Sequence, residues 1–130
     1  MATQPHLLVE SDDVHKTAII PGDPGRVERI ADQCKSVEHV AENREYTVVN
    51  AEYGGTPLTI CSTGIGCPSA AIAVEELEAV GVETVLRCGT TGALQSDIEI
   101  GDMVVATAAA KEEGTTKRYE SAVYPAAPDH

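Results

Sequence analysis

The sequence predicts an α/β protein in which a mixed β-sheet is flanked by helices. Short runs of β-branched and aliphatic residues alternate with segments whose apolar residues recur at helical spacing. Glycine-rich turns follow three of the predicted strands. This alternation, in which two strands twice follow each other directly, is typical of an α/β sandwich with a mixed sheet.

The first strand and the first helix are predicted near the N-terminus. Residues 17–20 form a β-branched run that ends in a turn of proline and glycine. Asp23 is a suitable N-cap, and Pro24 fits the first position of the helix. One face of this helix carries apolar residues at i, i+3, i+4 and i+7, namely Val27, Ile30, Ala31 and Cys34.

A hairpin and a second helix follow. Residues 46–53 and 57–63 are predicted strands joined through Gly54 and Gly55. A glycine-rich turn, residues 64–69, opens a helix that ends before Gly81. We expect a buried face of Ala73, Val74, Leu77 and Val80, and a solvent face that holds Glu75, Glu76 and Glu78.

The last third of the chain is less regular. Residues 84–88 are predicted as a strand that is buried on both faces, and residues 103–110 as the last strand. Residues 111–130 show no obvious element. A length of 130 residues favours one domain. Because residues 128–129 resemble the start of another helix, we expect the chain to be a fragment of a larger domain.

The composition is that of an acidic globular protein. It is 42% hydrophobic and 23% charged, which argues against disorder. The 21 acidic residues outnumber the 9 lysines and arginines, and the net charge of −12 disfavours nucleic acid and anionic membranes as partners. The acids are dispersed, so we expect a surface adapted to high salt, that is, a halophilic protein. The sequence shows neither a long apolar run nor a basic leader, from which we expect a cytoplasmic protein.

Neither the cysteines nor the histidines predict a metal site. Cys34, Cys61, Cys67 and Cys88 show no C-x-x-C spacing, and the 4 histidines are scattered. We expect the cysteines to be buried small side chains in a reducing compartment.

Ligand binding is expected at three junctions between a strand and a turn, residues 20–24, 62–66 and 87–92. In open α/β sheets, ligands bind beyond the carboxyl ends of the strands. Glycines there allow backbone N–H groups to approach an anion, and helix N-termini add positive potential. Ordinary turn formation is the alternative for each segment taken alone.

Two of the arginines occupy unusual positions. Arg26 lies in the first turn of a predicted helix, where the helix dipole disfavours a cation. Arg87 interrupts an apolar strand, although buried arginine is rare unless it is paired. A bound phosphate accounts for both positions, since guanidinium groups bind its oxygens bidentately. A structural salt bridge to one of the many acids is the alternative for each arginine.

Three motifs occur in register along the chain: Gly22-Asp23-Pro24-x-Arg26, Cys61-Ser62-Thr63-Gly64-Ile65-Gly66-x-Pro68-Ser69 and Arg87-x-Gly89-Thr90-Thr91-Gly92-Ala93. Together they resemble the nucleoside phosphorylase family, and within it the uridine phosphorylases. The resemblance covers nearly the whole chain but only the N-terminal half of such an enzyme. It implies a three-layer α/β sandwich that is incomplete here, so residues 1–130 alone are expected to be inactive.

The activity that the resemblance implies is reversible phosphorolysis of uridine to uracil and ribose 1-phosphate. Inorganic phosphate is the co-substrate, and no other cofactor is required. The reaction passes through a cationic ribose, so the site needs positioned anion ligands rather than a protein nucleophile. The implied partners are a nucleoside, phosphate and further copies of the chain, in a hexamer built from dimers when the protein is full length.

The resemblance also implies roles for individual residues. The phosphate ligands are Gly22, Arg26, Arg87 and Thr90, of which Arg87 and Thr90 are catalytic, with Arg44 added by a neighbouring subunit. The nucleoside-binding residues are Thr91, Gly92 and, again from the neighbour, His6. A potassium ion at a subunit interface is implied by Glu45, the Ile65 carbonyl and Ser69. The alternatives are a flexible terminus for His6 and a solvated acid at a strand edge for Glu45.

Two other functions stay open from the sequence. The related purine nucleoside and methylthioadenosine phosphorylases, and nucleosidases, share parts of these motifs. A non-catalytic α/β module that binds anions or self-associates is the third hypothesis. In the family, the residues that select the base come mainly from the half that this chain does not include.

Overall fold

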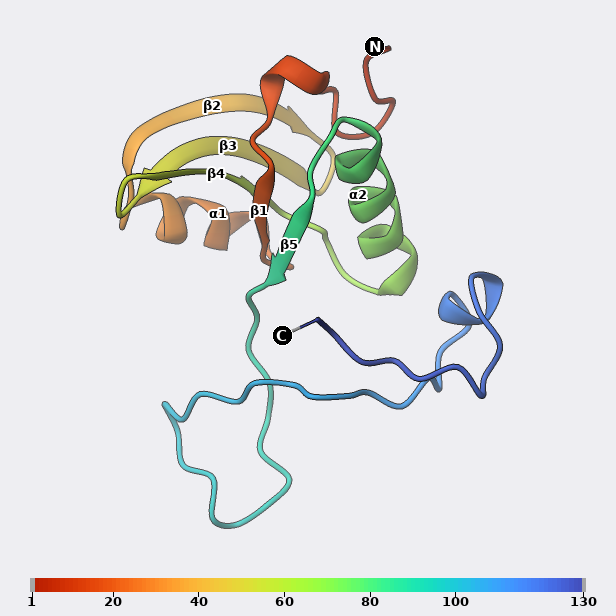
Figure 1. The fold of residues 1–130 in the computed structure, drawn as a ribbon. Helices are drawn as coiled ribbons and strands as arrows, with labels where there is room; N and C mark the ends of the chain where they lie inside the picture. Colours follow the sequence, from red (N-terminus) through yellow and green to blue (C-terminus); the bar gives the residue numbers. More distant parts are fainter. Residues whose placement is uncertain (1, 130) are drawn as a thin grey trace. The chain divides into compact units, whose positions relative to one another are not determined.

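The computed structural model describes residues 2–129, and the chain divides after Gly89 into two compact units. The first unit holds the five strands and both α-helices (Figure 1). Its elements in chain order are η1 (Ser11–Asp13), β1 (Thr17–Ile20), α1 (Pro24–Ala31), β2 (Lys35–Asn43), β3 (Tyr46–Tyr53), β4 (Thr56–Cys61), α2 (Cys67–Ala79) and β5 (Thr84–Arg87). The second unit holds one short 3-10 helix, η2 (Thr116–Arg118).

The strands form one mixed sheet in the order β2-β3-β4-β1-β5. β1 runs parallel to β4 and β5, whereas β3 is antiparallel to both β2 and β4. The carboxyl ends of β1, β4 and β5 therefore meet at one edge of the sheet. The predicted strands at residues 17–20 and 46–53, the hairpin and the mixed α/β sheet are all confirmed.

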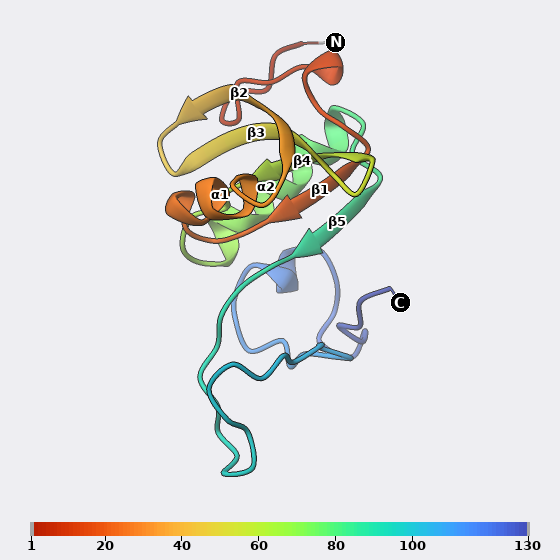
Figure 2. The same ribbon diagram turned by 90° about the vertical axis from the view of Figure 1, so that its left-hand side faces the viewer.

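The two helices cover opposite faces of the sheet, which gives three layers (Figures 1 and 2). On one face, Ala73 and Leu77 of α2 pack with alternate residues of β1, β3 and β4. On the other face, Val27 and Ala31 of α1 pack with the intervening residues of β3 and β4. Side chains alternate between the two faces of a strand, so β3 and β4 bury apolar residues on both faces of the sheet.

The helix ends follow the predicted capping residues. The Asp23 carboxylate accepts a hydrogen bond of 3.0 Å from the Gly25 amide, and Pro24 occupies the first turn of α1. After α2, Gly81 adopts a φ of 102°. Glycine reaches this left-handed conformation without steric cost, so Gly81 ends the helix.

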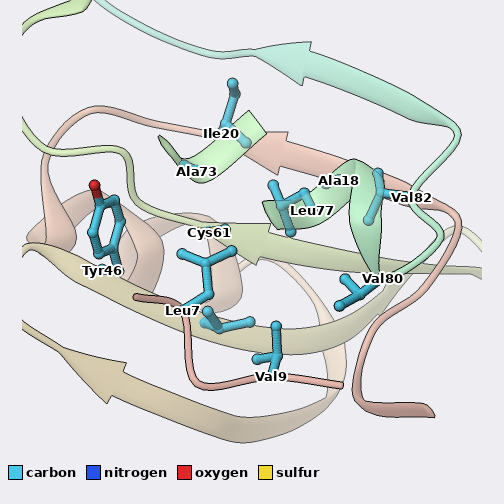
Figure 3. Packing of buried hydrophobic residues seen from close by; sticks show 11 residues of the cluster. Leu7, Val9, Ala18, Ile20, Tyr46, Cys61, Ala73, Leu77, Val80 and Val82 are labelled. Atoms are coloured by element: carbon cyan, nitrogen blue, oxygen red, sulfur yellow. The ribbon is translucent and has the colours of Figure 1, made fainter. Parts of the chain in front are cut away.

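The N-terminal segment, residues 5–9, is packed into the core (Figure 3). Leu7 and Val9 are 1% and 0% exposed and belong to the same cluster as Leu77 of α2. Burial of two aliphatic side chains stabilises this attachment by roughly 3–6 kcal/mol. Leu7 and Val9 thus attach the segment that carries His6 to the core.

The sequence does not predict one of the observed strands, β2. β2 lies at an edge of the sheet, with mostly exposed side chains and two register irregularities along its pairing with β3. Edge strands carry charged side chains and bulges, which prevent pairing with other molecules. The apolar alternation that marks a half-buried strand is therefore weak in this segment.

The strand predicted at residues 103–110 does not form. Met103 and Val105 are 89% and 72% exposed, and an isolated bridge joins Ala109 to Ala126. The second unit offers this apolar run no neighbouring strand, and strand propensity acts only through such neighbours. Across the described residues, no helix combines the length and apolarity that crossing a bilayer requires.

Two burial predictions for α2 and one for β5 are wrong. Val74 is 39% exposed, whereas Glu76 is 7% exposed on the face that packs on the sheet. Glu76 lies three residues after Ala73 and four before Val80, so helical spacing puts it on the buried face. β5 is an edge strand, and all of its residues are exposed, including Arg87.

The exposed edge at β5 predicts self-association of the 130-residue chain when it is produced alone. Val85 and Leu86 are 40% and 59% exposed on the last strand of the sheet. Such an edge pairs readily with another chain. We expect oligomers or aggregates in size-exclusion chromatography with light scattering, and Leu86→Lys should shift the population toward monomer. A monodisperse wild-type monomer with a cooperative thermal transition contradicts this prediction.

Candidate functional site

Three backbone segments converge where the parallel strands end. The Thr63 amide donates to the Pro21 carbonyl at 2.9 Å, which ties the turn after β4 to the turn after β1. The Cys88 amide donates to the Ile20 carbonyl at 3.3 Å, which ties the end of β5 to β1. The structure thus brings together the first two predicted junctions and the start of the third.

The guanidinium group of Arg87 lies at this convergence. Its Nη1 atom donates to the Cys88 carbonyl at 2.9 Å, and its Nη2 atom is 3.4 Å from where a Cβ atom would stand on Gly22. A Cβ atom on Gly89 would stand 2.6 Å from Nη1, so glycine leaves the room that the guanidinium needs. Among residues 2–129, no carboxylate forms a salt bridge with Arg87, so the structural salt bridge does not explain this residue.

Gly22 and Arg26 frame the start of α1. Gly22 lies two residues after the end of β1, and Arg26 is half-buried in the first turn of the helix. The N-terminus of α1 presents backbone N–H groups and the positive end of the helix dipole. With Arg87 beside Gly22, this end of the sheet offers donors and positive charge to an anion.

Three further predicted ligands, Thr90, Thr91 and Gly92, belong to the second unit. The segment is exposed, and the Thr91 hydroxyl lies 3.4 Å from the Gly92 carbonyl. These residues follow Gly89 directly in the chain, and their roles stay predictions.

Arg44 occupies the two-residue turn between β2 and β3. It is exposed and adopts a φ of 56°, in the left-handed region that favours glycine. The turn is held on both sides: the Asn43 side chain donates to the His6 carbonyl at 2.8 Å, and the Ser62 hydroxyl donates to the Glu45 carbonyl at 2.7 Å. Strained backbone of this kind persists where its surroundings hold it, and it is frequent at functional sites.

The predicted cation ligands Glu45 and Ser69 contact each other. The Ser69 hydroxyl oxygen lies 2.9 Å from Glu45 Oε1 and 2.5 Å from the Thr63 carbonyl oxygen. Hydrogen bonds from its own backbone amide and from the Ser69 hydroxyl lower the pKa of the Glu45 carboxyl, so this group is ionised. Together with the Ile65 carbonyl, these predicted ligands present only oxygen atoms. Hard cations prefer oxygen ligands, so the type of ligand atom fits a potassium ion.

His6 is held by a residue that the sequence pattern placed in solvent. Its ring Nδ1 atom lies 2.5 Å from Glu76 Oε1, and the backbone amides of His6 and Leu7 donate to the same carboxylate. The His6 side chain is 34% exposed, so part of the ring reaches the surface. The helical spacing of Glu76 is a signal that could have revealed its burial, although not its partner.

Gly64 lies between Gly22 and the Glu45–Ser69 pair. Its carbonyl oxygen is 3.5 Å from the Cβ position of Gly22. A Cβ atom on Gly64 itself would stand 2.6 Å from Glu45 Cγ and 2.8 Å from Ser69 Oγ. A glycine here allows one backbone turn to lie against both Gly22 and the Glu45–Ser69 pair.

The cysteines take no part in this arrangement as metal ligands. Cys61 is buried as predicted, and burial, with a smaller effect of the Glu76 charge, raises the pKa of its thiol to about 12. Cys67 and Cys88 are exposed, contrary to the prediction: Cys67 is the first residue of α2, and Cys88 follows the last residue of β5. Among the described residues, no cluster of three or more histidine, cysteine or acidic side chains could hold a metal ion.

The fold and the candidate site together define a class: a three-layer α/β protein with a glycine and an arginine side by side at the carboxyl ends of parallel strands. Residues 16–130 match the phosphorylase superfamily. The chain belongs to this superfamily.

Individual relatives agree with this assignment. The chain is 77% identical over 130 residues to a guanosine phosphorylase of Halorubrum lacusprofundi, covering 100% of this chain and 54% of that protein. It is 44% identical over 126 residues to the uridine phosphorylase of Escherichia coli, covering 95% and 50% of the two chains. The crystal structure of uridine phosphorylase from Vibrio fischeri superposes with a TM-score of 0.95 at 49% identity, covering 98% of this chain and 53% of that chain. Purine nucleoside phosphorylase from Toxoplasma gondii gives a TM-score of 0.92 at 38% identity, covering 96% and 51%.

The chain spans about half the length of the relatives it matches. Tests of activity therefore call for a full-length enzyme, in which this chain is continued to the length of its relatives.

Substitution of Gly64 by alanine in the full-length enzyme is expected to lower the free energy of unfolding by about 2–4 kcal/mol. The left-handed φ of 69° and the 2.6 Å approach to Glu45 Cγ both oppose a Cβ atom. Gly66→Ala is the matched control, because Gly66 has a φ of 94° and its nearest neighbour, Pro68 Cδ, is 3.8 Å away. Urea denaturation should show a clearly larger loss at Gly64, and equal losses at both positions would remove the steric argument.

Proposed function

We propose that the full-length enzyme is a nucleoside phosphorylase that transfers ribose from a nucleoside to inorganic phosphate. The observation that carries this proposal is the Arg87 guanidinium beside Gly22, where β1, β4 and β5 end. Guanidinium and glycine N–H groups match phosphate oxygens in charge and geometry. Membership of the phosphorylase superfamily supports the same chemistry.

The reaction needs no protein nucleophile. Phosphate held by Gly22, Arg26 and Arg87 attacks C1′ of the ribose, a bond forms between C1′ and a phosphate oxygen, and the bond from C1′ to the base nitrogen breaks. The base leaves with the electron pair of that bond and is then protonated. Positive charge that develops on the ribose is stabilised by the phosphate dianion, so the protein contributes mainly through fixed positions and fixed charges.

The remaining predicted residues complete the proposal. Thr90 adds a hydroxyl to the phosphate, and Thr91 and Gly92 line the nucleoside pocket. Arg44 and His6 act across a subunit interface, so the active unit is a dimer within a larger oligomer. Glu45, Ser69 and the Ile65 carbonyl would hold a potassium ion, which would offset the negative charge of Glu45 at that interface.

We propose guanosine as the preferred nucleoside, with uridine as the second candidate. The identity of 77% over the whole chain to a protein named guanosine phosphorylase supports guanosine. Uridine is supported by two uridine phosphorylases, which are 45% and 44% identical to this chain over 126 residues.

The test is release of base from guanosine and from uridine by the full-length enzyme, with and without phosphate. We expect release only with phosphate, together with ribose 1-phosphate, and faster turnover of guanosine. Release without phosphate would identify a nucleosidase instead. If phosphate raises the melting temperature but neither nucleoside reacts, a non-catalytic anion-binding module is the better description. Assays in dilute buffer and in molar potassium chloride also test the expected adaptation to salt. The net charge of −12 implies repulsion among the acidic side chains, and salt weakens this repulsion by screening.

A further inference from the structure

Glu76 is a buried carboxylate in an apolar environment. Its side chain is 9% exposed and lies on α2 between Ala73 and Val80, both of which belong to the core cluster. An ionised carboxylate in such a place is stable only when hydrogen-bond donors satisfy it. The partners of Glu76 therefore reveal what this residue is for.

Among residues 2–129, the donors to Glu76 come from His6 and Leu7 of the N-terminal segment. The Leu7 amide donates to Oε2 at 2.8 Å, and the His6 amide donates to the same oxygen at 3.1 Å. The third partner is the His6 ring, whose Nδ1 atom lies 2.5 Å from Oε1. The backbone amides would be sufficient to anchor a segment that already buries Leu7 and Val9, so the ring contact requires a separate explanation.

The ring contact fixes which nitrogen of His6 is available to a ligand. A carboxylate only accepts hydrogen bonds, so Nδ1 must carry the proton that it donates to Glu76. In the neutral ring, Nε2 is then the acceptor. The ring is further placed by Tyr46, which it meets edge-on at 6.5 Å between centroids, and by Asn43, which holds the His6 carbonyl at 2.8 Å.

We propose that Glu76 is a positioning residue, which holds the His6 ring so that unprotonated Nε2 accepts a hydrogen bond from a ribose hydroxyl of the nucleoside. The proposal rests on the proposed function, in which His6 binds the nucleoside of the neighbouring subunit. Glu76 itself touches neither substrate. It acts through the tautomer and the orientation of one ring, as carboxylates do when they orient a histidine in other sites.

The test combines Glu76→Gln with His6→Ala in the full-length enzyme. In Glu76→Gln, the amide oxygen can still accept from the backbone amides, which keeps the N-terminal segment in place. The amide nitrogen then faces Nδ1 as a donor, so the ring must change to the tautomer that carries its proton on Nε2. Ring nitrogen chemical shifts in two-bond ¹H–¹⁵N spectra report this change directly.

We expect kcat/KM for the nucleoside to fall by roughly 5- to 20-fold in Glu76→Gln, while KM for phosphate stays within about twofold. Glu76→Gln should have no further effect in the His6→Ala background, because its whole effect passes through that ring. The matched control is Glu75→Gln on the solvent face of α2, which should leave both parameters and the ring spectrum unchanged.

Each failure points to a different conclusion. A full-length enzyme that cleaves no nucleoside refutes the proposed function and the role of His6 with it. If the enzyme is active and Glu76→Gln lowers kcat/KM by the same factor in the His6→Ala background as in the wild type, the positioning role alone is refuted. Wild-type His6 with its proton on Nε2 also refutes it, whatever the kinetics show.

Discussion

Replacement of Arg87 by alanine in the full-length enzyme is expected to lower kcat/KM for phosphate by roughly 30- to 5,000-fold, equivalent to about 2–5 kcal/mol of transition-state stabilisation. The guanidinium stands beside Gly22 with backbone carbonyls as its partners and no carboxylate of residues 2–129 in a salt bridge with it. Its charge is therefore available to a phosphate. The measurement is steady-state kinetics at varied phosphate with the nucleoside at saturation.

The melting temperature decides between this role and a structural one. Arg87 is exposed on an edge strand, so its removal should change the melting temperature little. Arg87→Lys keeps the charge but loses bidentate binding, and its activity should lie between those of wild type and alanine. Arg29→Ala, at the exposed end of α1, is the control for loss of a positive charge and should behave as wild type. A fall in stability with unchanged phosphate dependence would assign Arg87 to the structure instead.

Removal of Arg44 in the full-length enzyme is expected to lower activity by about 100-fold or more, because the proposal makes its guanidinium a phosphate ligand of the neighbouring subunit. Two substitutions separate the charge from the backbone. Arg44→Ala keeps the strain of the φ of 56°, whereas Arg44→Gly relieves it and should stabilise the turn by roughly 1 kcal/mol relative to alanine. Both should lose activity equally. If Arg44→Gly alone keeps activity, the turn conformation matters and the guanidinium does not.

Co-expression of Arg44→Ala with Arg87→Ala tests whether Arg44 acts on the neighbouring subunit. Each site would combine Arg87 of one chain with Arg44 of the other, so about one quarter of the sites in random mixtures should be intact. Activity should recover toward that fraction, although each variant alone is nearly inactive. No recovery in oligomers shown to contain both variants would mean that Arg44 acts within its own chain or not at all.

The elements that the sequence predicts well are those whose cause is local. The β-branched run of residues 17–20, the Asp23 cap and the glycine after α2 each act within a few residues, and the structure confirms them. Two predictions are wrong for one reason. β2 forms although the sequence does not predict it, whereas the strand predicted at residues 103–110 does not form. Pairing with a neighbouring strand decides whether a segment becomes a strand, and neither charge nor apolarity within the segment reports that neighbour.

The site is predictable where a motif and a strand end coincide. Gly22 and Arg87 could be placed together because parallel strands share one carboxyl edge. The contact of Glu76 with His6 could not be foreseen in this way, because it joins residues that are 70 positions apart and depends on a buried acid. The same holds for Gly64, whose lack of a side chain matters only because Glu45 and Ser69 come from two other segments.

The attachment of the N-terminal segment to α2 also has a consequence for the order of folding. Residues 5–9 are made before α2, and the carboxylate that receives the His6 and Leu7 amides follows some 70 residues later. Contacts of such large sequence separation form slowly, because a long loop must close before any contact stabilises it. The hydrogen bonds to Glu76 can form only after α2 has been made. The His6 ring therefore reaches its place against Glu76 late in the folding of the first unit.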